Sequence, residues 1–211
     1  ITQVSEKGTV HSLAEIKALT AVAQEFGCPV HMDGARFTNA LVALGCTPAE
    51  MTWKSGVDAV SFGGTKNGLM GVEACVIFDP KKAWEFELRR KRGGHLFSKH
   101  RYLSAQMAAY LTDDLWLDMA KAANASTAQL AAGLRQHNQA ELLFEPDANM
   151  IFARYPRHAH KRLLDAGANY YVWDGDPQVG DPDEMLIARL VTDWSASEEA
   201  VAKFLKVLSE V

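Results

Sequence analysis

The sequence predicts an α/β protein that ends in a smaller α+β part, and two observations indicate this. Strand-like apolar runs alternate with helical patterns over residues 12–78, which is typical of crossover units on a parallel sheet. After a long helical and polar segment, residues 149–211 return to short strands between helices. We therefore expect residues 1–125 to form a large α/β domain with its connecting helices, and residues 126–211 a small α+β domain.

The first helix is expected over residues 12–26, where apolar residues recur at helical spacing. Ser12 is a candidate N-cap with Glu15 three residues later, and Gly27 follows the end. The remaining elements of the large domain are predicted from apolar runs bounded by glycine, proline and aspartate: a strand over 28–32, a helix over 35–44 stopped by Gly45, a short helical segment over 47–54, and strands over 56–62 and 73–78.

The second half of the chain predicts helices first and a mixed segment afterwards. Residues 81–134 are helical in pattern, with a break at Gly93-Gly94 and a strong apolar face over 104–117. We then expect a strand over 149–154, a helix over 158–166, strands over 170–173 and 185–191, and a final amphipathic helix over 197–211 capped by Ser195 or Ser197.

Composition sets limits on the class of protein. With 48% hydrophobic and 23% charged residues, the chain has the composition of a globular protein, and its net charge of -4 gives no general attraction to nucleic acid or anionic membranes. No apolar run reaches membrane-spanning length. The three cysteines show neither CxxC nor CxxH spacing, so neither a disulfide framework nor a metal site is predicted, and a reducing, cytoplasmic setting is expected.

The first candidate site is the stretch VSFGGTKNG, residues 60–68. A lysine that forms a Schiff base has to be held rigidly, and the glycines before Lys66 allow a backbone to approach a ligand closely. The hydroxyl of Thr65 can hydrogen-bond a phosphate or a ring oxygen. Taken alone, the stretch is more typical of a glycine turn with a solvated lysine.

The second candidate site is HMDGAR, residues 31–36. It places Asp33 at the end of a predicted strand, where a parallel α/β sheet has its binding crevice. A carboxylate beneath a pyridine nitrogen keeps that nitrogen protonated, and Arg36 can bind a carboxylate or phosphate. The alternative is an aspartate that caps the following helix. His31 either lies in the crevice or is an ordinary packed histidine, and we interpret it as packed.

The two stretches together indicate more than either alone. Asp33 and Lys66 end consecutive predicted strands that are separated by a helix. Neighbouring strand ends of one sheet bring a carboxylate and a lysine to the same crevice. A pyridoxal phosphate enzyme needs this pair.

The motifs GTV at residues 8–10, SLxEI at 12–16, HMDGARFTNA at 31–40 and SFGGTKNG at 61–68 closely resemble the threonine aldolase family. The resemblance implies a fold-type I pyridoxal phosphate enzyme related to β-eliminating lyases, and it runs over essentially the whole chain. It implies that the chain carries the C-terminal part of the large domain and the small domain, because the family's upstream phosphate-binding loop and ring-stacking histidine have no counterpart in the sequence.

The resemblance also implies roles for individual residues. Lys66 matches the Schiff-base lysine and Asp33 the partner of the pyridine nitrogen, with Gly64, Thr65 and Arg36 beside the cofactor pyridoxal 5'-phosphate. Arg189, in the strand LIARLVT, matches the arginine that binds the substrate carboxylate, and Arg36 is a second candidate for that role. An arginine pointing to solvent is the alternative for Arg189, since a charge inside an apolar strand needs solvent, a partner or a ligand.

The implied reaction is cleavage of a threonine- or phenylserine-type β-hydroxy-α-amino acid to glycine and an aldehyde. Another fold-type I reaction, such as β-elimination or transamination, and an inert fragment of such an enzyme are the alternatives. A homo-oligomer with shared active sites is expected. The basic stretch 89–101 either lies near a neighbouring subunit's cofactor phosphate, as the resemblance implies, or is a plain surface helix end.

Overall fold

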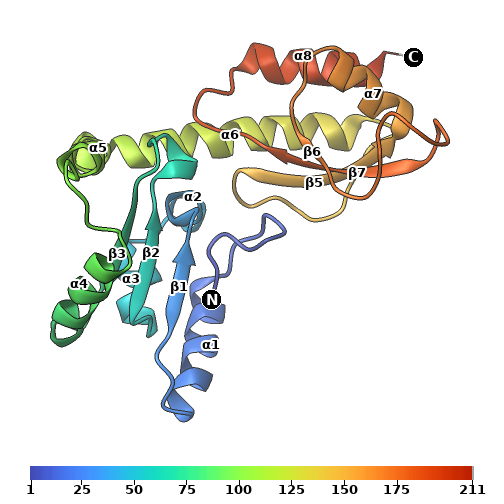
Figure 1. Cartoon of the computed structure of the whole chain (residues 1–211). Coiled ribbons are helices and arrows are strands. Elements are labelled where there is room, and N and C mark those ends of the chain that lie inside the picture. Colours follow the sequence, from blue (N-terminus) through green and yellow to red (C-terminus); the bar gives the residue numbers. More distant parts are fainter. Residues whose placement is uncertain (211) are drawn as a thin grey trace. The chain divides into compact units, whose positions relative to one another are not determined.

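The computed structural model of the protein describes residues 1–210, which fall into two compact units (Figure 1). Unit 1 comprises residues 1–4 and 10–119, and unit 2 comprises residues 5–9 and the chain from 120 onward. The boundary lies within α6 (Leu115–Gln136), a helix of 22 residues. Mixed helices and strands in both units agree with the predicted α/β class.

Unit 1 begins with α1 (Leu13–Glu25), whose N-terminus is a capping box. The hydroxyl of Ser12 accepts a hydrogen bond from the Glu15 backbone N–H at 3.2 Å, and the Glu15 carboxylate accepts one from the Ser12 N–H at 2.8 Å. Gly27 takes a φ of +64° just after the helix, which favours glycine. Both predicted ends of this helix are confirmed to within one residue.

The sheet of unit 1 has the order β1-β2-β3. Strands β1 (His31–Gly34) and β2 (Ala59–Gly63) are parallel, and the crossover between them consists of α2 (Phe37–Leu44), α3 (Pro48–Met51) and the 3-10 turn η1 (Trp53–Ser55). The predicted strand 28–32 begins later than expected. At Val30 the backbone N–H donates to the side chain of Asp58 at 2.7 Å and not to a strand partner.

Strand β3 (Glu73–Ile77) pairs with β2 in the antiparallel direction, which corrects the expectation of a parallel sheet. A parallel return needs a crossover of about a dozen residues or more. Only residues 64–72 connect β2 to β3, and their one helical element is the 3-10 turn η2 (Thr65–Asn67).

Two α-helices and two 3-10 turns lie between this sheet and α6. The 3-10 turn η3 (Pro80–Lys82) leads into α4 (Ala83–Arg92), which contains no buried residue. In α5 (Arg101–Leu111) Tyr110 is buried. The stretch 104–117, expected as one apolar face, is divided by η4 (Thr112–Asp114), where Asp113 leaves helical geometry with a φ of 51°.

Unit 2 is an antiparallel sheet of order β4-β5-β7-β6, covered on one face by helices (Figure 1). Its elements are β4 (Glu141–Leu142), β5 (Met150–Pro156), α7 (Arg157–Asp165), β6 (Tyr171–Val172), β7 (Met185–Val191) and α8 (Glu198–Ser209). One apolar cluster joins residues of α6, α7 and α8 to alternate residues of β5 and β7: Leu130, Leu134, Leu163, Val201, Leu208, Ile151, Ala153, Tyr155, Ala188 and Leu190. Ser197 caps α8 as predicted.

Candidate active site

The parallel pairing of β1 and β2 places two predicted site segments side by side. Asp33 lies opposite Ser61 in the register, and the strands end one residue and two residues later, respectively. In β1 the exposed positions are His31 and Asp33, whereas Met32 and Gly34 are buried. The Asp33 side chain therefore lies on the open face of the sheet, at the carboxyl end of its strand.

The carboxylate of Asp33 is held by a local turn. Its Oδ1 accepts a hydrogen bond from the backbone N–H of Ala35 at 3.0 Å, as in an Asx-turn. Helix α2 takes Arg36 as its N-cap and has no side-chain cap. The alternative that Asp33 caps this helix is therefore wrong.

His31 is exposed and not packed, which corrects its interpretation from the sequence. Its Nε2 lies 2.8 Å from the hydroxyl of Ser61, the residue opposite Asp33. Strand alternation places His31 and Asp33 on the same face, so the open face carries a short polar group made of His31, Asp33 and Ser61.

The turn after β1 touches the last residue of β2 through its backbone, and the loop after β2 folds back on itself. A Cβ built on Gly63 would lie 2.6 Å from the carbonyl oxygen of Ala35, and one built on Gly64 would lie 2.7 Å from the carbonyl oxygen of Val72. Real side chains do not fit at such distances. Both glycines are thus required by contacts within the chain, in addition to any ligand that they admit.

Lys66 lies in the turn η2, which Gly68 ends with a φ of +109°. Its side chain is exposed. The neighbouring Thr65 is also exposed; its backbone N–H donates to the Glu73 carboxylate at 3.1 Å, and its hydroxyl donates weakly to the carbonyl of Val72 at 3.4 Å. The lysine therefore projects from a loop whose backbone is held on both sides.

Two buried residues, Asn67 and Tyr110, hold this loop in place, and the sequence interpretation missed both. Asn67 is 4% exposed and Tyr110 is 1% exposed, and the Asn67 amide donates to the Tyr110 hydroxyl at 2.5 Å. For Asn67 the sequence did offer a signal, because a polar residue stands there between the candidate lysine and a glycine. No sequence signal pointed to Tyr110, which lies 43 residues further on.

Arg36 is half-buried at the start of α2, in unit 1 with Asp33, Gly64, Thr65 and Lys66. Arg189 lies in unit 2, in the middle of β7, opposite Phe152 of β5 and Tyr171 of β6. The structure thus brings five of the six predicted site residues into one unit and places the sixth in the other.

The surroundings of Arg189 are aromatic. Its side chain is half-buried, and its Nε lies 3.1 Å from the Met150 sulfur. The ring of Trp173 lies 5.4 Å from that of Phe152 and 5.8 Å from that of Tyr171. A guanidinium on such a surface, opposite the helix-covered face, can present its planar N–H groups to a carboxylate.

The basic stretch 89–101 is held partly by its own helix. Arg89 pairs with Glu85 at 2.7 Å and Arg90 with Glu87 at 3.0 Å, all within α4. Exposed pairs of this kind contribute little to stability. They do neutralise two of the positive charges of the stretch.

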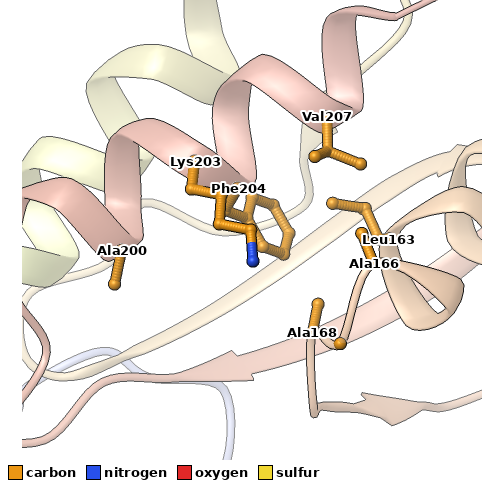
Figure 2. Close-up of a pocket in the computed structure, with 8 residues that line it drawn as sticks. Leu163, Ala166, Ala168, Ala200, Lys203, Phe204 and Val207 are labelled. Carbon is orange, nitrogen blue, oxygen red and sulfur yellow. The ribbon is translucent and has the colours of Figure 1, made fainter.

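A pocket of about 230 Å³ lies in unit 2 between α7 and α8 (Figure 2). Lys203 and Phe204 extend from α8 toward Leu163, Ala166 and Ala168. None of the predicted site residues lines it. Within residues 1–210 there is no helix long and apolar enough to cross a membrane, and no cluster of three or more His, Cys, Asp or Glu side chains suited to a metal ion.

Comparison with known proteins gives one consistent result. The sequence pattern of the beta-eliminating lyase family matches residues 1–156. A low specificity L-threonine aldolase from a Pseudomonas species is 40% identical to this chain over 95% of its length. A low specificity L-threonine aldolase from Pseudomonas aeruginosa is 38% identical over 98% of its length. Those alignments cover 56% and 57% of the two enzymes, so the chain spans little more than half the length of these relatives.

The fold is shared with a solved enzyme. The structure of the threonine aldolase of Leishmania major superposes on 99% of this chain with a TM-score of 0.84 and 25% sequence identity, over 59% of its own length.

Proposed function

The chain belongs to the beta-eliminating lyase family, and we propose that it carries the lysine half of a pyridoxal phosphate-dependent aldolase. The proposed reaction cleaves a β-hydroxy-α-amino acid, of the threonine or phenylserine type, to glycine and an aldehyde. The observation that carries the proposal is the backbone contact between Ala35, in the turn after β1, and Gly63, the last residue of β2, because it brings the segment after Asp33 beside the start of the loop that bears Lys66. The threonine aldolases among its relatives support the choice of reaction.

The residues present suit pyridoxal phosphate. Lys66 is exposed, and its side-chain nitrogen has no hydrogen-bond or ion-pair partner within residues 1–210. Asp33 uses Oδ1 for the Ala35 N–H, and its other oxygen is engaged by none of the described residues. The chain thus offers a lysine amine for the aldehyde of the cofactor and a carboxylate oxygen for its pyridine N–H.

We assign one task to each of these side chains. Lys66 would supply the amino group that holds the cofactor. Asp33 keeps the proton on the pyridine nitrogen, because a carboxylate stabilises the cationic ring. Thr65, Gly64 and Arg36 complete the cofactor's surroundings in unit 1. When bound, pyridoxal phosphate withdraws the electron pair left on Cα as the Cα–Cβ bond breaks.

The substrate's carboxylate is assigned to Arg189, with Arg36 as a second contributor. Fixing that carboxylate sets the orientation of the bond that breaks. The proton lost from the β-hydroxyl is matched by one gained at Cα, so that the β-carbon becomes the carbonyl carbon of the aldehyde and Cα becomes the methylene carbon of glycine, which retains the amino and carboxylate groups.

The test of this function is trapping at Lys66. The protein is incubated with pyridoxal phosphate and reduced with borohydride, and the modified peptides are identified by mass spectrometry. We expect the adduct on Lys66 in the wild type and neither adduct nor threonine cleavage in Lys66→Ala. Lys203→Ala, which removes an exposed lysine of α8, is the matched control and should behave as the wild type. Cleavage by Lys66→Ala at the wild-type rate would overturn the assignment.

A β-elimination is the second candidate, because the family pattern that matches is that of beta-eliminating lyases. Product analysis separates the two reactions. Acetaldehyde and glycine from threonine support the aldolase, whereas ammonia and a keto acid support elimination.

We also propose that the protein forms a homo-oligomer with shared active sites and works in the cytoplasm. Helix α4 has no buried residue, and the large apolar side chains Trp84, Phe97 and Tyr102 are 70%, 52% and 61% exposed. Apolar groups in such positions are typical of interaction surfaces. All three cysteines are free, as in a reducing compartment. Analytical ultracentrifugation of the wild type and of Trp84→Glu tests the assembly.

A further inference from the structure

The loop that bears Lys66 is held by one buried amide. Asn67, the next residue, donates one hydrogen bond to the Tyr110 hydroxyl at 2.5 Å and another to the backbone carbonyl of Trp116 at 2.9 Å. A side-chain amide has two N–H donors, and both are used. Asn67 therefore ties η2 to the α5–α6 segment of the same unit.

The hydroxyl of Tyr110 makes a second contact, to Thr38. Its oxygen lies 3.3 Å from the Thr38 hydroxyl. Because the Asn67 amide donates to Tyr110, the tyrosine's own proton is available for Thr38. Burial raises the pKa of Tyr110, so this proton is retained at neutral pH.

Thr38 lies in the first turn of α2, the helix that begins just after the Asp33 turn. Tyr110 thus has the lysine loop on one side of its hydroxyl and the start of the aspartate-side helix on the other.

Aromatic packing fixes the ring that carries this hydroxyl. Phe62, in β2, lies 6.1 Å from the ring of Tyr110, 5.5 Å from Phe37 and 5.8 Å from Trp116. The hydroxyl is therefore a polar point at the edge of an apolar cluster. The hydrogen-bond partners therefore fix the position of this hydroxyl, because a buried polar group left without a partner is unfavourable.

We propose that Tyr110 is a positioning residue, whose hydroxyl fixes the loop of Lys66 relative to the strand end of Asp33. The inference rests on the proposed function, in which those two side chains address one cofactor. Tyr110 is buried and acts through Asn67 and Thr38. Its value to the reaction lies in geometry, since displacements of about 1 Å in a reacting group cost up to about 100-fold in rate.

The test compares Tyr110→Phe with the wild type by two measurements. The first is the ratio of borohydride-trapped pyridoxal phosphate on Lys66 to that on Lys203, an exposed lysine of the other unit. The second is hydrogen exchange of peptides covering residues 35–40 and 64–69. We expect the ratio to fall by about 10-fold or more, and exchange to rise in both peptides together.

Tyr155→Phe is the matched control, because Tyr155 is also a fully buried tyrosine but lies in unit 2. It should change neither the ratio nor the two peptides. Thr38→Val removes the other end of the contact while keeping the ring and should reproduce the effect, which keeps the test informative if Tyr110→Phe does not fold.

The outcomes separate this inference from the proposed function. A wild type without preferential labelling at Lys66 counts against the proposed function. Hydrogen exchange then tests only whether Tyr110 links the segments 35–40 and 64–69. Faster exchange with an unchanged labelling ratio shows a merely structural role and overturns the positioning role. Unchanged exchange in both folded variants overturns it as well.

Discussion

Gly63 and Ala35 are in backbone contact: a Cβ on Gly63 would lie 2.6 Å from the carbonyl oxygen and 2.8 Å from the Cα of Ala35. Ala35 comes two residues after Asp33, and Gly63 comes three residues before Lys66. The spacing of the two candidate groups is thus set by backbone packing, where the loop after β1 meets the last residue of β2 and the loop of Lys66 begins.

Gly63→Ala should therefore disturb both loops at once. The added methyl group meets backbone, which cannot rotate away, so we expect a loss of about 1–3 kcal/mol in the free energy of unfolding and a loss of pyridoxal phosphate labelling at Lys66. Urea unfolding and the labelling assay measure the two effects. A variant with wild-type stability and labelling would show that the loops tolerate separation.

Arg189→Lys should weaken the binding of substrate more than it weakens the fold. A lysine keeps the charge but loses the planar pair of N–H donors that matches a carboxylate, so KM for the amino acid should rise by about 10-fold or more, as for loss of a charged hydrogen bond. Steady-state kinetics give the value.

Arg154→Lys is the matched control for that experiment. Arg154 lies two residues from Phe152 along β5 and pairs with Glu141 at 2.6 Å, so its replacement should leave KM unchanged. Equal effects of the two variants would argue for a general role of guanidinium groups on this face.

Arg157 anchors the segment between β6 and β7. It is 7% exposed, and its guanidinium donates to the carbonyl oxygens of Asp176 and Asp181 and pairs with Glu184. Arg157→Gln leaves these acceptors unpaired. It should lower the free energy of unfolding by about 1–3 kcal/mol and speed proteolytic cleavage between residues 174 and 184.

Glu184→Gln provides the comparison for Arg157. The Glu184 side chain is about half exposed, so losing its charge should change stability by less than about 1 kcal/mol, with the backbone contacts of Arg157 kept. An equally large effect would show that the ion pair, and not the carbonyl contacts, holds the segment.

Local patterns were enough to predict most of the fold. Ser12 and Glu15 form the expected capping box, and β7 occupies the predicted residues 185–191. Strand direction was harder, because β3 looks like any apolar strand and only the length of the connection 64–72 shows that it must be antiparallel. The break at Asp113 was missed, since an acidic pair inside an apolar pattern carries no strong stop signal.

The candidate site was predictable where chemistry-bearing residues follow strands and unpredictable where contacts are distant in sequence. Asp33 lies at the end of β1 and Lys66 shortly after the end of β2, so their neighbourhood could be inferred from topology. The burial of His31 was predicted wrongly, because strand alternation shows that His31 and Asp33 share a face of the sheet but does not show which face is covered. Tyr110 meets Asn67 across 43 residues, and such a pairing appears only when α5 is placed in space.

The buried histidine of α7, His160, gives unit 2 a defined dependence on pH. His160 is fully buried, with its ring stacked on Tyr155 at 4.0 Å between centroids. Its Nε2 lies 3.0 Å from the Leu186 carbonyl oxygen, and its Nδ1 lies 3.0 Å from the Tyr170 hydroxyl. Because a carbonyl can only accept, Nε2 carries the proton and Nδ1 accepts from Tyr170, whose pKa burial raises to about 12. The neutral imidazole therefore has both nitrogens satisfied.

Burial lowers the pKa of His160, and this outweighs the opposing effects of the Leu186 carbonyl and Asp174, which favour the charged ring. With a folded pKa below the unfolded value of about 6.5, the unfolded chain binds a proton that the folded chain does not. The contribution of His160 is complete above about pH 6.5 and is lost as the pH falls below it, at up to about 1.4 kcal/mol per pH unit. His160→Gln, whose amide can serve both partners, should flatten the dependence of the urea midpoint on pH between 5 and 7.5, whereas His95→Gln, at an exposed histidine, should not. If His160→Gln keeps the slope of the wild type, the acid sensitivity belongs to other groups.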